Sequence, residues 1–324
     1  MSFVYSCTPD GDFPCGWYTV VCGVACKGGF MRIFLAGGTG FVGGHVRKAL
    51  LARGHSIRLL VHKRSGGNEP GVEEFEGDAT LLPSFAAAAN GFDATINLIG
   101  IIREFPQRGV TFQRLHVEAT RNILAAAHNA GVRRHLQMSA LGTRPDASTG
   151  YFASKFRAEE EVRASGLDYT ILRPSIIFGP KDDFVNKLAG LLRGLPVMPV
   201  IGDGAYHLQP ISADDVARCF VEALEKPETI GKSYELCGPD RLSYNALLDT
   251  IARVIGKKSV LKVKNPLALM RLVVPVLQRF SFFPITTDQI EMLVEGSGCD
   301  GSWRQTFGFE PVGFEAGIRS YLKA

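Results

Sequence analysis

Apolar residues along this chain form short runs that alternate with segments of helical periodicity. In the helical segments they recur every three or four positions, which places them on one face. Strands are predicted over residues 32–36, 56–61, 72–77, 94–100, 134–139 and 169–174. Helices are predicted over residues 41–53, 81–89, 112–130 and 151–165. Strands and helices in alternation imply parallel strands with right-handed crossovers, so we expect an α/β protein with a doubly wound parallel sheet.

The second half of the chain is less regular. A loop is expected over residues 176–183, helices over 186–195, 213–224 and 244–255, and strands over 233–237 and 260–263. We therefore expect a sheet domain over residues 31–180, to which segments between about 205 and 240 return. Residues 181–324 should mainly form a smaller α/β lobe that contacts a substrate or a partner.

Composition excludes several classes of protein. The 324 residues are 46% hydrophobic and 21% charged, with a net charge of +4, as in ordinary globular proteins. The sequence has no arginine-rich run and no zinc-type spacing of Cys and His, so we expect neither a nucleic-acid partner nor a metal site. No apolar stretch reaches the roughly 18 residues that a membrane-spanning helix needs.

Residues 1–30 do not continue the pattern. Their apolar part is preceded by Asp10 and Asp12, and Lys27 is the first basic residue, whereas a secretory signal begins with positive charge. We interpret the segment as a disordered extension, or as an upstream start before a true beginning at Met31. A signal peptide, a lipoprotein signal and a metal-binding cysteine pair are the alternatives.

Three later cysteines stand apart from one another in the sequence. Cys219, Cys237 and Cys299 are interpreted as buried or neutral thiols in a reducing compartment. This favours a cytoplasmic location.

A glycine-rich turn follows the first predicted strand and begins the first predicted helix. Its residues are Gly37, Gly38, Thr39, Gly40, Phe41, Val42 and Gly43. Glycines at these spacings permit a tight turn, and the following helix N-terminus offers free N–H groups to phosphate. In the strand–turn–helix context the pattern predicts a dinucleotide site of Rossmann type, with a turn that binds no ligand as the alternative.

The second predicted strand ends in His62, Lys63 and Arg64. A protein that binds NAD(H) usually has Asp or Glu at this point, to hold the ribose hydroxyls. Cations suit a 2′-phosphate instead, and arginine can hold it with two hydrogen bonds. We therefore expect NADP(H) as the cofactor, with NAD(H) as the alternative; the three residues could also be a solvated surface run.

Two further strand ends are candidates for cofactor contact. Asp78, followed by Ala79, is placed to meet the adenine amino group, or else begins the helix predicted over 81–89. Leu98, Ile99 and Gly100 end the fourth strand, either at the cofactor edge of the sheet or as a plain strand end.

Tyr151 and Lys155 lie one turn apart on a predicted helix, so their side chains share a face. A nearby ammonium favours the phenolate, which would make Tyr151 a usable acid and base, and it can also hold a ribose. Ser139 ends the fifth strand, where its hydroxyl could polarise a substrate carbonyl. These three residues are the candidate catalytic set; a surface helix with an unrelated serine is the alternative.

With these motifs the chain resembles the extended, epimerase-like branch of the short-chain dehydrogenase/reductase superfamily over about residues 31–322. The likeness rests on GGTGFVGG (37–44), GDAT (77–80), NLIG (97–100), MSALG (138–142), YFASK (151–155), ILRPSIIFGP (171–180) and QPISADDVA (209–217). The resemblance implies catalytic roles for Ser139, Tyr151 and Lys155, and a nicotinamide wall from Pro174 to Ile177. It also implies that Asp214 and Asp215 brace the substrate lobe, where simple helix capping is the alternative.

Within that branch the chain looks most like the nucleotide-binding accessory subunit of respiratory complex I and its bacterial relatives. INLIGIIRE (96–104), GPKDDFVNK (179–187) and TTDQIEML (286–293) carry this likeness. His116 stands where many extended members have Asn, which weakens a proton-relay interpretation. We therefore consider two functions: an NADP(H)-dependent oxidoreductase or epimerase/dehydratase, and a non-catalytic nucleotide-binding subunit of a membrane assembly.

Residues 257–283 combine basic and apolar character. Lysines and arginines flank or interrupt the apolar run 266–283. Such a segment can lie on a membrane surface, dock on a partner or cover a substrate pocket, or it can be a helix packed in the core of its own lobe and kinked by Pro275. Membrane contact would place the protein at the periphery of an inner membrane; the substrate is an unknown small molecule.

Overall fold

The computed structural model describes residues 29–278 and 285–322. The expectations for residues 1–28 and for 279–283 lie outside the described residues. The main body is a seven-stranded sheet in the order β11-β6-β5-β4-β1-β2-β3, and each neighbouring pair is parallel. Its strands are β1 (Arg32–Ala36), β2 (Ser56–Val61), β3 (Val72–Glu76), β4 (Ala94–Asn97), β5 (Arg134–Met138), β6 (Asp168–Pro174) and β11 (Lys232–Leu236).

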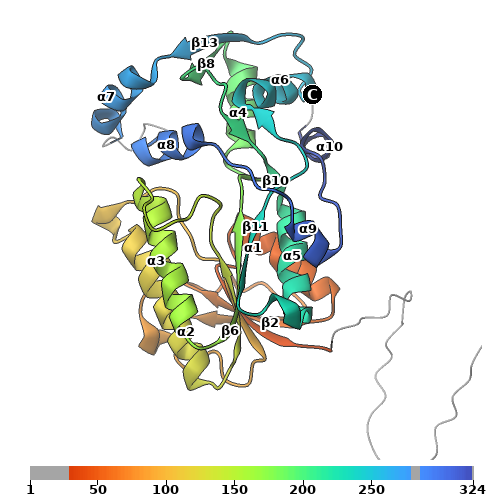
Figure 1. Ribbon diagram of the computed structural model, residues 1–324. Helices are drawn as coiled ribbons and strands as arrows, with labels where there is room; N and C mark the ends of the chain where they lie inside the picture. The colour runs from red at the N-terminus through yellow and green to blue at the C-terminus, as the bar shows by residue number, and fades with distance from the viewer. Residues whose placement is uncertain (1–28, 279–284, 323–324) are drawn as a thin grey trace, which may run out of the picture.

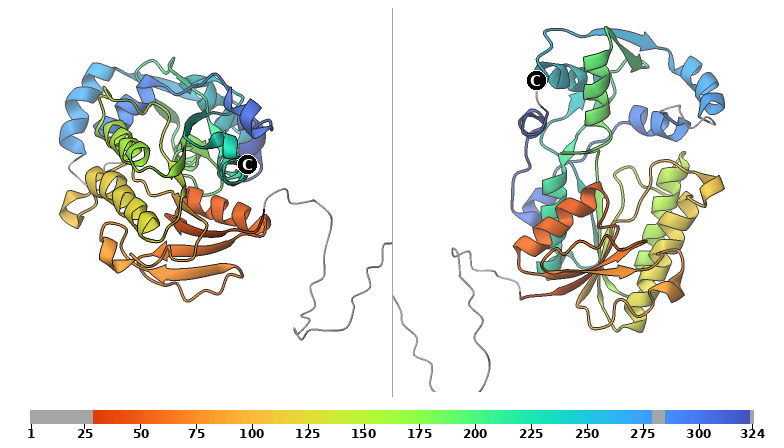
Figure 2. Two further views of the ribbon diagram at one scale, coloured as in Figure 1. Left: turned by 60° about the horizontal axis from the view of Figure 1, so that its bottom comes forward. Right: turned by 180° about the vertical axis from the view of Figure 1, so that it is seen from behind.

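Helices cover both faces of this sheet, as the doubly wound prediction requires (Figures 1 and 2). One face carries α1 (Phe41–Ala52), α5 (Ala213–Glu225) and the short α9 (Trp303–Phe307), while α2 (Ala119–Asn129) and α3 (Gly150–Ala164) cover the other. Four of the five residues of β1 are fully buried, because a strand in the middle of a parallel sheet is enclosed on both sides. This confirms the fold class.

The strand order changes direction at β1. The chain continues from β1 to β2 and β3 on one side, and then returns to β4, which pairs with β1 on the other. In open α/β sheets, ligands bind at the carboxyl ends of the strands beside such a switch point. A ligand site is therefore expected at the carboxyl ends of β1 and β4.

The smaller lobe has its own hydrophobic core and lies above the carboxyl edge of the sheet in Figure 1. Its helices are α4 (Val185–Gly194), α6 (Tyr244–Val254), α7 (Leu267–Leu277), α8 (Thr287–Glu295) and α10 (Phe314–Arg319). Its strand pairs are β8 (Val197–Ile201) with β13 (Leu261–Asn265), β9 (His207–Leu208) with β12 (Leu242–Ser243), and β7 (Ile177–Phe178) with β10 (Ile211–Ser212). The predicted loop at 176–183 therefore begins with a short strand.

The helix predicted over residues 81–89 is wrong. Only a single turn of 3₁₀ helix, η1 (Leu82–Ser84), forms there. The amides of Phe85 and Ala88 bond three residues back, and the hydroxyl of Ser84 accepts from the amide of Asp78. Apolar side chains such as Phe85 still face the core, so the periodicity was real although the backbone is not α-helical.

The helix predicted over residues 112–130 has two parts. Its first part, η3 (Gln113–Glu118), is a π-helix, and α2 continues from Ala119. π-Helical turns are rare and are frequent at functional sites. This one contains His116, whose side chain is buried.

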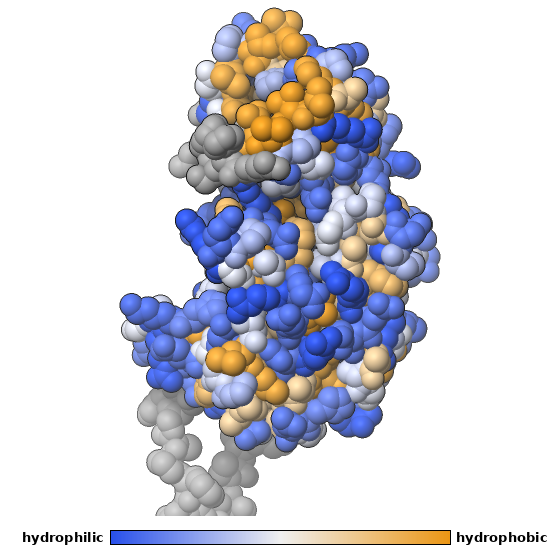
Figure 3. All heavy atoms as spheres, turned by 90° about the vertical axis from the view of Figure 1, so that its left-hand side faces the viewer, coloured by the Kyte–Doolittle hydropathy of each residue, from blue (hydrophilic) through white to orange (hydrophobic). Residues whose placement is uncertain are grey.

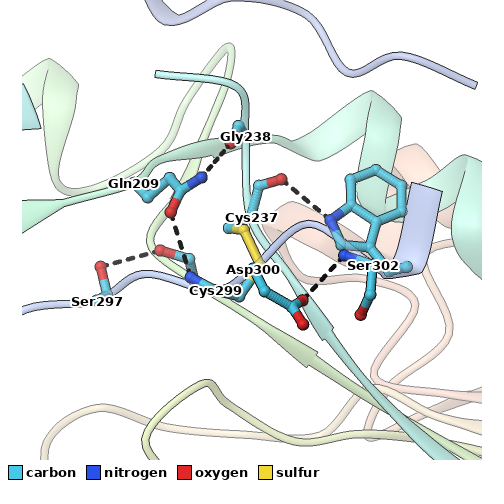
Figure 4. Close-up of a disulfide and its surroundings, with 9 residues drawn as sticks. Gln209, Cys237, Gly238, Ser297, Cys299, Asp300 and Ser302 are labelled. Carbon is cyan, nitrogen blue, oxygen red and sulfur yellow. Dashed lines mark hydrogen bonds between the residues drawn. A yellow bond between two sulfur atoms is a disulfide. The ribbon is translucent and has the colours of Figure 1, made fainter. Parts of the chain in front are cut away.

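The interpretation of Cys237 and Cys299 as separate thiols is also wrong. The structure joins them in a disulfide between the end of β11 and the segment before α9, with their Cα atoms 6.0 Å apart (Figure 4). They are 62 residues apart in sequence, so no local pattern could have paired them. Cys219 is a buried free cysteine, as expected.

Helix α7 does not pack into the core of its own lobe. Val274 is its one buried residue, whereas Leu269, Leu272 and Val276 are exposed. With the exposed Leu261 and Val263 of β13 these side chains form an apolar surface, which we call the α7 surface (Figure 3). Pro275 lies inside the helix, as expected. None of the helices in the described residues is long and apolar enough to cross a membrane.

Candidate functional site

The glycine turn lies between β1 and α1, against the end of β4. Gly37 has a φ of 79°, and a Cβ there would meet the backbone nitrogen of Ile99 at 2.8 Å. A Cβ on Gly43 would meet the carbonyl oxygen of Gly37 at 2.3 Å. Neither backbone neighbour can move away easily, so glycine is required at both positions for the helix to approach the sheet this closely.

The N-terminus of α1 is available for an anion. Gly40 is the N-cap and provides no side-chain hydrogen bond, and the first turn contains no acidic residue. The amide groups of the first turn, which includes Phe41, Val42 and Gly43, therefore have no side-chain acceptor at the cap. Thr39 is exposed beside them. This is the geometry in which a helix N-terminus holds phosphate.

His62, Lys63 and Arg64 follow β2 and are all exposed. Within residues 29–278 and 285–322, neither Lys63 nor Arg64 has an ion pair. Glu74 lies close enough for Arg64 to help lower its pKa, although hydrogen bonds from Ser65 are the larger cause. Arg64 thus has an acidic neighbour, while Lys63 faces solvent.

Asp78 follows β3 and holds a turn rather than beginning a helix. Its carboxylate accepts hydrogen bonds from the amide and the hydroxyl of Thr80, both at 2.8 Å. Burial works against its ionisation, but these hydrogen bonds and the nearby His62 lower its pKa overall. Ala79 is buried beside it.

The end of β4 is held by a buried amide. Asn97 accepts from the amide of Ile99 at 3.0 Å and donates to Thr120 and Gln137. This network holds the backbone of Leu98, Ile99 and Gly100 where it faces the glycine turn. Sequence inspection missed it, because its members come from β4, β5 and α2.

Tyr151 and Lys155 are adjacent on α3, and Lys155 is buried beneath the loop that follows β4. Its ammonium group donates to the carbonyl oxygens of Ile99 at 3.2 Å and Met138 at 3.3 Å. A Cβ on Gly100 would lie only 2.9 Å from this nitrogen. Burial lowers the pKa of Lys155 to about 8, although Glu159 acts in the opposite direction.

The phenol of Tyr151 is surrounded by rings. It makes edge contacts with Phe112, His116 and Phe152 at centroid distances of 5.4–5.9 Å. Burial raises its pKa to about 12, which is opposite to the shift expected from a nearby ammonium. The reason is that desolvation outweighs any attraction from Lys155, whose ammonium is directed to backbone carbonyls.

His116 joins this group from the π-helix. Its Nε2 accepts from the amide of Ile101 at 3.1 Å, so the proton of the neutral ring is on Nδ1, which donates to Ser154 Oγ at 2.8 Å. The hydroxyl of Ser154 in turn donates to the carbonyl oxygen of Tyr151. Burial and the charge of Lys155 lower the pKa of His116 to about 2, so it is neutral at physiological pH.

Ser139 is buried directly after β5. Its hydroxyl is 3.4 Å from that of Thr143. Burial acts to raise the pKa of Glu159, but hydrogen bonds from Arg173 and, more weakly, from Ser139 lower it overall. Pro174 ends β6 and Ile177 begins β7. All three therefore lie at the same edge of the sheet as Lys155 and the glycine turn.

Helix α8 brings a residue that sequence inspection missed. Asp288 Oδ2 accepts from the amide of Tyr151 at 3.3 Å, so a carboxylate from the small lobe lies at the N-terminus of α3. The signal in the sequence was the Thr286–Gln289 capping box, which marks the start of α8.

The two aspartates at α5 have different roles. Asp215 accepts from Ser212 Oγ and from the amide of Val312, so it does brace the C-terminal segment. Asp214 is exposed and pairs with His45 of α1 at 2.6 Å. The N-cap of α5 is Ser212, so neither aspartate is the N-cap residue, but both lie in the first turn and Asp215 is hydrogen-bonded to Ser212.

A doubly wound parallel sheet, a glycine turn before an uncapped helix at the switch point, and a Tyr–Lys pair at the same edge define a dinucleotide-binding protein of the short-chain dehydrogenase/reductase type. The chain belongs to the NAD(P)H-binding family whose model matches residues 37–227.

Curated relatives include subunits of respiratory complex I. The chain is 32% identical over 214 residues to the mitochondrial NADH dehydrogenase [ubiquinone] 1 alpha subcomplex subunit 9 of Mus musculus, covering 63% of this chain and 56% of the mouse protein. It is 26% identical over 299 residues to the NADH-ubiquinone oxidoreductase 40 kDa subunit of Neurospora crassa, covering 89% and 78%. The chain thus spans little more than half of the mouse relative.

Other relatives are reductases, and the fold recurs in sugar-nucleotide enzymes. Ceramide reductase of Caulobacter vibrioides is 30% identical over 199 residues, covering 59% of this chain and 62% of that protein. Among solved structures, gox2253 is 26% identical with a TM-score of 0.70, covering 89% and 96%. The dTDP-glucose 4,6-dehydratase DesIV of Streptomyces venezuelae is 22% identical with a TM-score of 0.69, covering 90% and 95%, a likeness of fold alone.

Proposed function

We propose that the chain is an NADP(H)-dependent oxidoreductase or epimerase/dehydratase that uses Ser139, Tyr151 and Lys155. The observation that supports this most is the position of Tyr151 and Lys155 on α3, at the sheet edge that also carries the glycine turn. When bound, a nicotinamide dinucleotide would provide hydride chemistry at this site. The residues of the chain bind it, orient the substrate and move the proton.

Cofactor binding follows the sheet edge. The amides of Gly40 to Gly43 hold the pyrophosphate, and His62, Lys63 and Arg64 hold the 2′-phosphate. Asp78 and Ala79 would flank the adenine, Leu98 to Gly100 would form the wall over the glycine turn, and Pro174 and Ile177 would line the nicotinamide. These assignments favour NADP(H) over NAD(H).

Proton transfer belongs to Tyr151. With its pKa raised to about 12, its hydroxyl keeps the proton at neutral pH and can give it to a carbonyl oxygen in the transition state. Lys155, with a pKa lowered to about 8, has to turn from the carbonyl oxygens of Ile99 and Met138 to hold the ribose and to stabilise the phenolate that remains. Ser139 orients the carbonyl.

The test compares Tyr151→Phe with the wild-type protein. NADPH and NADH are titrated by fluorescence, and NADPH oxidation is followed on a panel of carbonyl compounds. We expect turnover to fall about 10²- to 10⁴-fold, because a general acid typically contributes that much, while NADPH affinity is unchanged. Tyr169→Phe is the control.

Two outcomes contradict the proposal. A protein that binds neither dinucleotide is not a nicotinamide-dependent enzyme. A Tyr151→Phe variant that keeps full turnover shows that Tyr151 does not transfer the proton.

A second candidate function is a non-catalytic nucleotide-binding subunit of a membrane assembly. His116 occupies the Asn position, and the ammonium of Lys155 is engaged by two carbonyl oxygens. The complex I relatives agree with this alternative. NADPH binding without turnover on any carbonyl compound would favour it.

Under either function, the α7 surface is the candidate for contact with a membrane or a membrane complex. Within the basic and apolar segment 257–283, residues 257–278 expose apolar side chains of α7 and β13. The exposed Lys258 and Lys264 bring positive charge to the same region. A short apolar helix with basic neighbours suits an anionic membrane surface. We propose that the protein lies at the periphery of a membrane; the disulfide between Cys237 and Cys299 removes the argument for a reducing compartment.

A further inference from the structure

The Cys237–Cys299 disulfide lies where the small lobe returns to the sheet. Cys237 is buried directly after β11, and Cys299 is half-buried in the segment 296–302, between α8 and α9. No feature of the proposed chemistry uses either sulfur atom. Figure 4 shows the bond in the middle of a group of polar contacts that come from both parts of the molecule.

Those contacts connect the segment 296–302 and the start of α9 to the end of β11, partly through Gln209. The amide of Cys299 donates to Gln209 Oε1 at 3.2 Å, and Gln209 Nε2 donates to the carbonyl oxygen of Gly238 at 2.8 Å. Beyond the disulfide, Trp303 Nε1 donates to the carbonyl oxygen of Cys237 at 3.2 Å. Gln209 thus bridges the two chain segments that the disulfide joins.

The segment also reaches the proposed nicotinamide wall. Ser297 Oγ accepts from Ser175 Oγ at 2.9 Å, and Ser175 lies between Pro174 and Ile177. The amide of Ser175 bonds to Leu236 of β11, just before Cys237. The disulfide thus joins the end of β11 to the segment 296–302, and hydrogen bonds of Ser175 attach the strand end that would face the nicotinamide to both of them.

We propose that Cys237 and Cys299 form a redox-responsive clamp that controls the cofactor end of the site. This rests on the proposed dinucleotide binding. The oxidised pair holds the segment 296–302 against Gln209 and Ser175. The reduced pair leaves the hydrogen bonds and the buried Trp303 and Phe307 of α9 as the remaining attachment. The stretch before α9 can then move, so the wall loosens and NADP(H) is held more weakly.

Reduction by a dithiol is chemically simple here. A thiolate of the dithiol attacks the more accessible Cys299 Sγ, the disulfide bond breaks, and Cys237 leaves as a thiolate that takes a proton. The second thiol of the dithiol then displaces Cys299 from the mixed disulfide. The protein gains two electrons and two protons, and the dithiol becomes a cyclic disulfide.

The experiment measures NADPH affinity in the two redox states of the full chain. Purified protein is first blocked with an alkylating agent and digested without reductant, and mass spectrometry must find the peptide that contains both Cys237 and Cys299. NADPH is then titrated before and after treatment with dithiothreitol. We expect the Kd to rise about fivefold or more on reduction, at the lower end of usual coupling between sites, and to recover on reoxidation.

Variants make the result specific. Cys237→Ser and Cys299→Ser should each bind NADPH as weakly as the reduced protein does, and dithiothreitol should not change their Kd. One of the two variants is sufficient for this test if the other does not fold. Cys219→Ser is the matched control, since Cys219 is buried but unpaired, and it should respond like the wild-type protein.

Each contrary outcome has one meaning. Equal affinity in both redox states, even with a lower melting temperature on reduction, makes the disulfide purely structural and overturns the clamp. Absence of the cross-linked peptide overturns it as well. Failure to bind NADPH in either state counts against the proposed function instead.

Discussion

Single side chains at the end of β2 decide which dinucleotide the site should prefer. Lys63 and Arg64 are exposed and stand where a carboxylate would hold the ribose hydroxyls of NAD(H). Their positive charges attract the negative charge of a 2′-phosphate, and an arginine can donate two hydrogen bonds to it. Glu74 lies near Arg64 and competes with a phosphate for it.

Replacing both Lys63 and Arg64 with Ala should therefore change cofactor choice. We expect the Kd for NADPH to rise about 10- to 100-fold, since each lost charge-assisted contact costs about 1.5 kcal/mol or more, while the Kd for NADH changes little. Fluorescence titration of both dinucleotides measures this, with the exposed Lys187→Ala in the small lobe as control. Equal weakening of both would refute the 2′-phosphate assignment.

At the scale of elements, α7 is the part whose sequence and environment disagree. It is strongly apolar, yet Leu272 is 73% exposed and only Val274 is buried. A helix of this composition normally turns its apolar face to a core. Exposed apolar surface gathered on one element usually marks an interaction site.

The α7 surface should bind anionic lipid vesicles. Leu272→Glu with Val276→Glu removes apolar contact and adds like charge, so we expect binding to vesicles that contain phosphatidylglycerol to fall tenfold or more. Co-sedimentation measures it, and neutral phosphatidylcholine vesicles test the role of charge. Leu191→Glu, an exposed leucine of α4, is the matched control. If wild-type protein and the double variant sediment equally, the α7 surface does not bind lipid.

At the scale of the whole molecule, buried histidines make stability depend on pH. Burial lowers the pKa of His116 to about 2, with help from Lys155, and that of His135 to about 4. In the unfolded chain both titrate near 6.5. The unfolded state therefore binds more protons as the pH falls below about 6.5, and acid favours unfolding.

We expect the contribution of these histidines to the free energy of unfolding to be constant above pH 6.5 and to decrease as the pH falls below it. Each of the two histidines should remove about 1.4 kcal/mol per pH unit from the free energy of unfolding, down to its own folded pKa. Urea denaturation between pH 7 and pH 4.5 measures the slope. His116→Asn should reduce that slope, with the exposed His207→Asn as control; an unchanged slope would mean that His116 is not held neutral.

Local pattern was sufficient for most of the fold. The alternation of apolar runs with helical periodicity predicted the strands of the sheet and its main helices, because each element buries a face that its own sequence defines. The glycine turn was equally readable, since a backbone that approaches this closely excludes every side chain. The helix at 81–89 was not, because apolar side chains spaced three or four residues apart can also face the core along one 3₁₀ turn and the irregular turns that follow it.

What the sequence determined by itself was the doubly wound sheet, its dinucleotide turn and the spacing of Tyr151 and Lys155. Tertiary structure alone decided that Cys237 meets Cys299, that Asp288 reaches the start of α3, and that α7 stays exposed. It also decided that Lys155 is directed to backbone carbonyls and that Tyr151 is desolvated. These facts depend on contacts between residues far apart in the chain, which local periodicity does not encode.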